Sequence, residues 1–239
     1  MVIDIEPNTD DCLHVVLIGA GLRLSQRSSK EPSVSRIGET DLSVSHDPSL
    51  QPLFQLPADL PEPGDDGACA HLLGMSMPPV TLLSTTGRSV NLAKVLGRWV
   101  LFVYPMLGNP ATALPPGWDD MPGARGCTLQ SCGFRDEHRR LLALTRHVYG
   151  MSNQSHGDQC EASERLGLPY QLLSDDNMEL QDALQLPTFE LNRRVYYKRV
   201  TLIVQDGVVA AVFYPVFPPD RNAADVLDWL QSHVPTAKV

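Results

Sequence analysis

The sequence predicts a mixed α/β fold, with a central β-sheet flanked by helices, over residues 71–235. Three observations support this prediction. Trp99–Tyr104 is a continuous apolar run rich in β-branched and aromatic residues, as in a buried central strand. Residues 199–213 carry a strong hairpin pattern, and helical patterns separate the strand-like segments. Strands that alternate with helices build layered α/β domains.

Each element in the first half of the domain has a local reason. Thr86-Gly87 is a typical turn pair between two β-prone segments, and the prolines and glycines of residues 105–122 exclude regular structure. Beyond Cys127, Phe134 and Leu141 recur at helical spacing. In chain order we predict a hairpin at Val80–Leu83 and Ser89–Leu92, a strand at Trp99–Tyr104, a loop at 105–122, a helix from Cys127 to about Arg146 and a strand at His147–Ser152.

The second half is marked by helix caps and by a turn. Gly167 is a helix stop signal, Asp175 can cap a following helix, and Gln205-Asp206-Gly207 is a hairpin turn. Asn222 is predicted to cap the last amphipathic helix. In chain order we predict helices at Asp158–Leu166 and Asn177–Leu184, a hairpin at Arg199–Val204 and Val208–Phe213, and a final helix to near His233 with Val226, Leu227 and Leu230 facing inward.

The N-terminal part of the chain differs from this domain. Residues 24–52 are rich in serine and charge without a sustained period, so residues 1–55 are predicted to be a poorly ordered extension. A linker containing proline and glycine follows at residues 56–70. Gly19-Ala20-Gly21 matches part of a dinucleotide fingerprint but lacks a third glycine, so a nucleotide-binding module is only a weak alternative.

Charge and hydropathy exclude several classes of partner. The chain has 239 residues and a net charge of −9, which disfavours nucleic acid and anionic membrane surfaces. No apolar run approaches the roughly 20 residues that span a bilayer. The apolar stretch 14–22 is short and has acidic rather than basic residues before it, unlike a signal peptide. We therefore expect a cytoplasmic protein that binds neither nucleic acid nor membranes.

The chain has five cysteines, which are too few and too irregularly spaced for a secreted disulfide scaffold. In a reducing compartment, the close pair Cys127 and Cys132 is more typical of catalysis or metal binding than of structure. Cys12 and Cys69 lie in the extension and linker and are predicted to be incidental. Cys160 is expected to be a packed thiol, with a second resolving role as an alternative.

Cys127 follows Gly126 at the predicted start of a helix. Unpaired backbone N–H groups and the helix dipole favour a thiolate at that position. Residues five apart, such as Cys127 and Cys132, have Cα atoms about 8.6 Å apart on an ideal helix, whereas a disulfide requires about 4.4–6.8 Å. A Cys127–Cys132 bond therefore requires the first helical turn to unwind.

The segment Gly126–Cys132, followed by Gly133-Phe-Arg-Asp136, resembles the active-site segment of atypical two-cysteine peroxiredoxins. The resemblance is to the subgroup of the bacterioferritin co-migratory protein. It extends through Leu168–Asp175 and Arg199–Val204 and covers about residues 72–233. It implies a thioredoxin-like fold.

The resemblance also implies roles for single residues. Cys127 would attack the peroxide and become a sulfenic acid, and Cys132 would resolve it to an intramolecular disulfide. Arg199 stands at the position of the family's active-site arginine, where it would stabilise the thiolate and the peroxide. The expected substrate-binding residues are Gly126, Thr128 and Pro105.

The same resemblance implies the partners. The substrate would be hydrogen peroxide or an organic hydroperoxide, and thioredoxin or a similar dithiol would reduce the disulfide. No metal or organic cofactor is expected. The protein would be a monomer or a homodimer.

The loop before Cys127 departs from the family pattern. Ala124 stands three residues before the cysteine, where the family has threonine or serine, and 21 residues separate Pro105 from Cys127, far more than in the family. The hydroxyl group that positions peroxide is therefore absent or comes from Thr128 or Thr112.

This departure keeps other hypotheses open. The main alternative is a thioredoxin-fold redox sensor or interaction protein with weak or no peroxidase activity. Two buried structural thiols, a zinc site that includes His138, and an Arg199 that is only a surface cation are the simpler alternatives.

Overall fold

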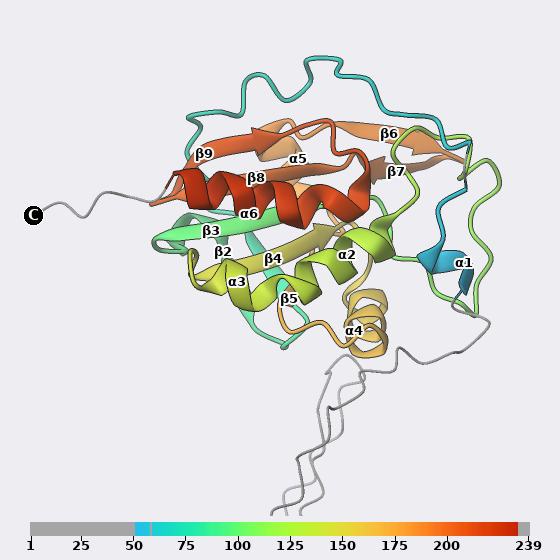
Figure 1. Cartoon of the computed structure of the whole chain (residues 1–239), viewed down its shortest axis with the longest axis horizontal. Coiled ribbons are helices and arrows are strands. Elements are labelled where there is room, and N and C mark those ends of the chain that lie inside the picture. The colour runs from blue at the N-terminus through green and yellow to red at the C-terminus, as the bar shows by residue number, and fades with distance from the viewer. Residues whose placement is uncertain (1–50, 58, 234–239) are drawn as a thin grey trace, which may run out of the picture.

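A seven-stranded mixed sheet forms the centre of the computed structural model, which describes residues 51–57 and 59–233 (Figure 1). The strand order is β2-β1-β5-β4-β3-β8-β9, with parallel pairing of β3 to β4 and of β4 to β5. The predicted central sheet is therefore confirmed. Its strands are β1 (Thr81–Ser84), β2 (Ser89–Asn91), β3 (Arg98–Val103), β4 (His147–Ser152), β5 (Gln171–Ser174), β8 (Val200–Gln205) and β9 (Val208–Phe213), and a separate hairpin pairs β6 (Thr188–Leu191) with β7 (Arg194–Tyr197).

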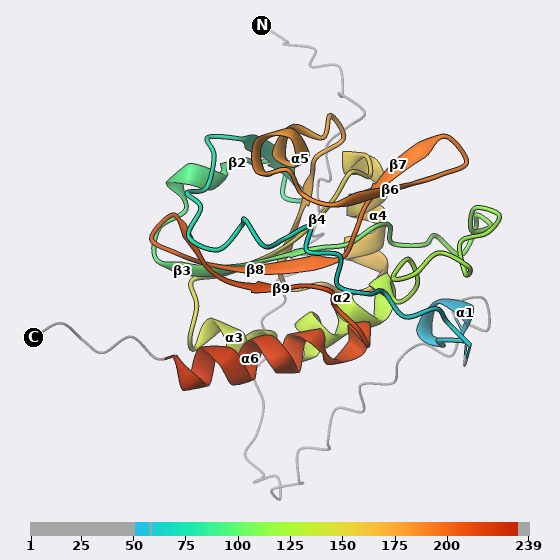
Figure 2. The same cartoon turned by 90° about the horizontal axis from the view of Figure 1, so that it is seen from above.

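Helices cover both faces of the sheet. In Figure 2, α2, α3 and α6 lie together below the strands and α5 lies above them. Side chains of α4 join the same apolar cluster as those of α2 and α6, whereas α5 packs into the opposite cluster. The helices are α1 (Gln51–Phe54), α2 (Cys127–Asp136), α3 (His138–Leu142), α4 (His156–Arg165), α5 (Glu179–Leu184) and α6 (Asn222–Ser232), with 3₁₀ turns at Leu92–Lys94 and Pro219–Arg221.

Strand β3 supplies both cores because successive side chains of a strand point to opposite faces. Trp99 and Leu101 belong to the cluster on one face, and Val100 and Phe102 to the cluster on the other. Phe102 stacks on Phe134 of α2, with ring centroids 4.1 Å apart and planes inclined by 7°. This contact holds α2 against the central strand and so fixes the helix that begins with Cys127.

The structure differs from the predicted elements at α2 and at the β6–β7 hairpin. The helix expected from Cys127 to about Arg146 is interrupted at Glu137, whose φ of −89° and ψ of 0° separate α2 from α3. The β6–β7 hairpin was not predicted. Its turn residues Asn192 and Arg193 have positive φ of 52° and 62°, so the glycine that usually marks such a turn is missing.

The N-terminal boundary of the fold also differs from the expected one. Residues 51–54 form α1, although the prediction places them in a poorly ordered extension. Cys69, which is 5% exposed, lies in the core with Leu72, so it is not an incidental linker cysteine. Cys12 and Gly19-Ala20-Gly21 lie outside the described residues. Within the described part of the chain, no helix is both long and apolar enough to cross a membrane.

Candidate active site

Cys127 is the first residue of α2 and lies almost completely inside the protein, with 4% of its surface exposed. Gly126 precedes it with a φ of 94°, a conformation that favours glycine. A Cβ atom on Gly126 would lie 2.2 Å from Cγ of Pro219, so the close approach also requires glycine. Cys127 Sγ donates a hydrogen bond to the carbonyl oxygen of Ala124 at 3.5 Å. Ala124 therefore contributes a backbone acceptor where the family contributes a hydroxyl group.

Arg199 contacts the same sulfur. Its Nη2 lies 3.3 Å from Cys127 Sγ and also donates to the carbonyl oxygens of Arg125 at 3.0 Å and Gly123 at 3.2 Å. Arg199 is 4% exposed, so it is not a surface cation. A buried guanidinium beside a thiol favours the thiolate form and can also stabilise a developing oxyanion.

Three buried polar residues hold Arg199 in place. Its Nη1 donates to Oε1 of Gln130, whose Nε2 donates to Oδ1 of Asn222 at 2.8 Å. Thr201 Oγ1 donates to the same Asn222 oxygen at 2.7 Å. The sequence prediction that Asn222 caps α6 is wrong, because the N-cap is Arg221 and the Asn222 side chain serves this network instead. The one signal in the sequence was a polar residue, Thr201, within the apolar run Val200–Val204.

Cys132 lies in the same helix and is 6% exposed. Burial raises the pKa of its thiol, and the positive charge of Arg135 opposes this shift. Both Cys127 and Cys132 are free thiols. Because both belong to one regular helix, the structure represents the reduced, fully folded state, and a bond between them still requires α2 to unwind.

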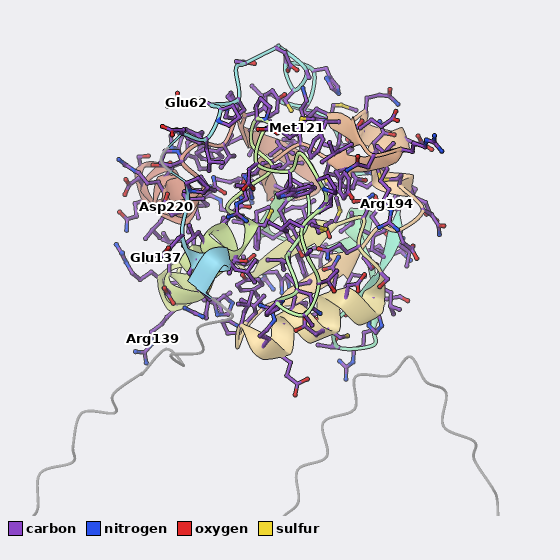
Figure 3. All side chains as sticks on the ribbon, turned by 90° about the vertical axis from the view of Figure 1, so that its right-hand side faces the viewer. Glu62, Met121, Glu137, Arg139, Arg194 and Asp220 are labelled. Carbon is purple, nitrogen blue, oxygen red and sulfur yellow. The ribbon has the colours of Figure 1, made fainter. Side chains whose placement is uncertain are left out.

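A small pocket lined by residues of α1, of the loop after β3 and of the start of α2 reaches Cys127. Figure 3 views the molecule with α1 and the loop residue Met121 facing the reader. Thr128 and Gly126 line this pocket, whereas Pro105 is buried and its neighbour Met106 lines the pocket. Thr112 is exposed on the loop outside the pocket. The lining residues are Leu53, Gln55, Met106, Gly108, Leu114, Trp118 and Ala124–Thr128.

Aromatic packing holds this loop in place. Trp118 contacts Tyr196 of β7 edge to face, with centroids 5.0 Å apart, and Phe189 of β6 at 6.0 Å. The β6–β7 hairpin, which was not predicted from the sequence, therefore supports the irregular loop that carries Trp118.

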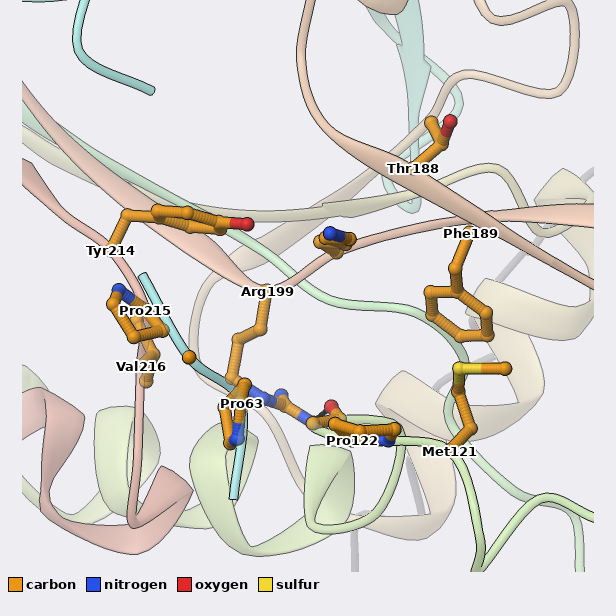
Figure 4. A pocket seen from close by; sticks show the side chains of 12 residues that line it. Pro63, Met121, Pro122, Thr188, Phe189, Arg199, Tyr214, Pro215 and Val216 are labelled. Carbon is orange, nitrogen blue, oxygen red and sulfur yellow. Dashed lines mark hydrogen bonds between the residues drawn. The ribbon is translucent and has the colours of Figure 1, made fainter. Parts of the chain in front are cut away.

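A second cavity, of about 410 Å³, lies on the other side of Arg199 (Figure 4). Its walls are mostly apolar and include Met121, Phe189 and Val216. Arg199 crosses it with the guanidinium directed toward Pro122. The Arg199 Nε is buried and has no hydrogen-bond partner among the described residues. Across those same residues, no three His, Cys, Asp or Glu side chains are grouped so that they could hold a metal ion.

A helix-terminal cysteine under a buried arginine, on a thioredoxin-like sheet, defines a thiol-peroxidase type of site. The Redoxin family model matches residues 72–227. The chain belongs to this family, and its curated relatives are peroxiredoxins.

These relatives include chloroplastic peroxiredoxins Q. That of Sedum lineare is 29% identical over 160 residues, which are 66% of this chain and 77% of the relative. That of Suaeda salsa is 28% identical over 193 residues, or 80% of each chain.

Solved peroxiredoxin structures share the fold. Peroxidoxin BcpB from Mycobacterium tuberculosis has a TM-score of 0.53 and 25% identity, and the match covers 67% of this chain and 96% of that one. Peroxiredoxin Q from Xanthomonas campestris has a TM-score of 0.52 and 18% identity, with 74% and 99% covered. The predicted thioredoxin-like fold is confirmed.

Proposed function

We propose that the protein is a thiol-dependent peroxidase that reduces hydrogen peroxide or organic hydroperoxides at Cys127. The observation that carries this proposal is the 3.3 Å contact between Arg199 Nη2 and Cys127 Sγ, made where α2 begins. The charge and the helix terminus both favour the thiolate, which is the nucleophilic form of cysteine.

In the first step, the Cys127 thiolate attacks one oxygen of the peroxide. An S–O bond forms while the O–O bond breaks, and the departing hydroxide or alkoxide takes up a proton and leaves as water or alcohol. The sulfur is oxidised to a sulfenic acid, and the peroxide is reduced. Arg199 stabilises the negative charge as it moves from sulfur to oxygen.

In the second step, the thiol of Cys132 attacks the sulfenic sulfur, so that a disulfide forms and water leaves. Burial and the raised pKa make Cys132 a poor nucleophile while α2 is folded. Unwinding of the first turn of α2 therefore exposes this thiol as well as bringing the two sulfurs together. A thioredoxin-type dithiol then reduces the disulfide by exchange and becomes oxidised itself. The small, irregular set of cysteines supports a reducing, cytoplasmic location in this proposal.

The roles of the two cysteines can be separated by mass spectrometry. The reduced wild-type protein is treated with one equivalent of hydrogen peroxide, alongside Cys127→Ser and Cys132→Ser, with a sulfenic-acid trap present. We expect a Cys127–Cys132 disulfide in the wild type, a trapped adduct on Cys127 in Cys132→Ser, and no adduct on Cys132 in Cys127→Ser. An adduct on Cys132 in the last variant would contradict the assigned roles.

A redox sensor is the second candidate, and the Ala124 position favours it. This residue offers a carbonyl oxygen to Cys127 instead of a hydroxyl group that could bind peroxide. A sensor would form the Cys127–Cys132 bond by exchange with a disulfide reagent but only slowly with dilute peroxide. The peroxidase reacts fastest with peroxide, so the identity of the faster oxidant distinguishes the two.

A further inference from the structure

A segment from outside the Redoxin match covers the approach to Cys127. Residues 53–56, which we call the strap, precede the matched region that begins at residue 72. Leu53 and Gln55 line the pocket that ends at Cys127, while Phe54 packs against the core beneath α2. The strap is therefore a wall of the active site that lies outside the Redoxin match.

The two leucines of the strap, Leu53 and Leu56, pack against glycines. A Cβ atom on Gly108 would lie 2.8 Å from Cδ2 of Leu53, closer than real Cβ contacts come. A Cβ atom on Gly126 would lie 3.3 Å from Cδ2 of Leu56. Both leucines thus pack directly onto backbone, one on the loop and one beside Cys127. This fit indicates a specific docked position for the strap and not an incidental contact.

The loop contributes three apolar side chains to the same pocket. Met106, Leu114 and Trp118 face the space that Leu53 closes. Trp118 is 3% exposed and is held by its contact with Tyr196, whereas Leu53 is only half-buried. The strap is therefore the less firmly packed wall of the pocket.

We propose that Leu53 is a specificity-determining residue, which limits the size of the hydroperoxide that reaches Cys127. Cys127 is 4% exposed and lines the same pocket as Leu53 and the loop, so a reactant that enters by this pocket passes between them. Hydrogen peroxide is small enough to pass with little displacement, whereas a hydroperoxide with a bulky organic group must push the strap aside. This inference rests on the proposed peroxidase function and adds a preference for small peroxides.

The test compares full-length Leu53→Ala with the wild type and with Leu73→Ala, a control at a leucine that is 64% exposed. Stopped-flow measurements give the rate constants of Cys127 oxidation by cumene hydroperoxide and by hydrogen peroxide. We expect the ratio of the bulky to the small substrate to rise at least about tenfold in Leu53→Ala, as for other changes of pocket size. Leu53→Met, which nearly conserves volume, should keep most of the restriction, and Leu73→Ala should leave the ratio unchanged.

A second readout does not depend on peroxide chemistry. Reduced protein is alkylated with iodoacetamide or with a pyrene maleimide, and the modification of the Cys127 peptide is followed by mass spectrometry. Leu53→Ala should accelerate the bulky reagent more than the small one. If neither ratio differs from that of the wild type, the strap does not restrict access and the inference is wrong. Peroxide oxidation no faster than that of a free cysteine would instead contradict the proposed function, while the alkylation ratio would still test the strap.

Discussion

Arg199 Nη2 lies 3.3 Å from Cys127 Sγ, although the two residues are 72 positions apart in the chain. The arginine precedes β8 and the cysteine begins α2, so the contact forms only when the sheet and the helix are packed together. The same nitrogen bonds two carbonyl groups of the loop just before Cys127. One buried cation therefore both shapes this loop and contacts the sulfur of Cys127.

Arg199→Lys should slow the oxidation of Cys127 by about a hundredfold, the scale seen when one donor to a developing oxyanion is lost. Lysine keeps the charge, but its single ammonium group cannot bind Gln130 and still reach the loop carbonyls and the sulfur. Stopped-flow oxidation by hydrogen peroxide measures the effect. Arg88→Lys, at an exposed arginine, is the matched control. If Cys127 of Arg199→Lys is oxidised as fast as that of the wild type, the geometry of the guanidinium is not needed.

Gln130→Ala should lower both stability and rate. The change leaves Arg199 Nη1 without its buried acceptor, although Asn222 keeps the hydrogen bond from Thr201, and such a loss costs about 1–3 kcal/mol of the free energy of unfolding. Oxidation should slow because Arg199 is no longer held. Denaturant titration and stopped-flow oxidation measure the two effects. Since Gln130 and Asn222 belong to one network, their alanine variants should combine non-additively, and strictly additive effects in the double variant would argue against this network.

Oxidation should unfold the first turn of α2. Amide hydrogen exchange over residues 130–132 should be slow in the reduced protein and much faster in the disulfide form, because the two cysteines are too far apart on an intact helix. Exchange over β3 should not change, which makes this strand an internal control. Peroxide-treated Cys132→Ser should keep its protected helix. Equal protection in the reduced and disulfide forms would contradict the local unfolding step.

Stability of the reduced protein should fall as the pH rises above about 8.5, the usual thiol pKa. Burial raises the pKa of Cys69 to about 12 in the folded state and also raises that of Cys132. Unfolded thiols therefore ionise first, and their contribution to stability is complete below about 8.5 and is lost as pH rises toward the folded pKa values. Denaturant titrations under reducing conditions measure this decline. In Cys69→Ala the free energy of unfolding should decline less steeply with pH. An equally steep decline in this variant would show that other groups cause the pH dependence.

Much of the site could be predicted from the sequence, because its strongest signals are local. Gly126 and Cys127 mark a helix start through their spacing and neighbours, and the family resemblance identified Arg199. The buried strand Trp99–Tyr104 is equally local, since a short apolar, β-branched run predicts it. The structure places all of these close to where the sequence predicts them.

The remaining features depend on contacts between distant segments. Gln130 and Asn222 are ordinary polar residues in a sequence, and only the packed fold shows that they share a hydrogen bond. The β6–β7 hairpin turns through Asn192 and Arg193 without glycine, so no turn signal marks it. Leu53 lies next to a serine-rich stretch, and its contact with Gly108 forms only when the distant loop packs against it.

The most direct test of the central claim is stopped-flow oxidation of the reduced protein by hydrogen peroxide, with Cys127→Ser and Cys132→Ser in parallel. We expect rapid oxidation in the wild type, its loss in Cys127→Ser, and an accumulating sulfenic acid in Cys132→Ser. Oxidation of the wild type no faster than that of a free cysteine would contradict the peroxidase function and favour a redox sensor.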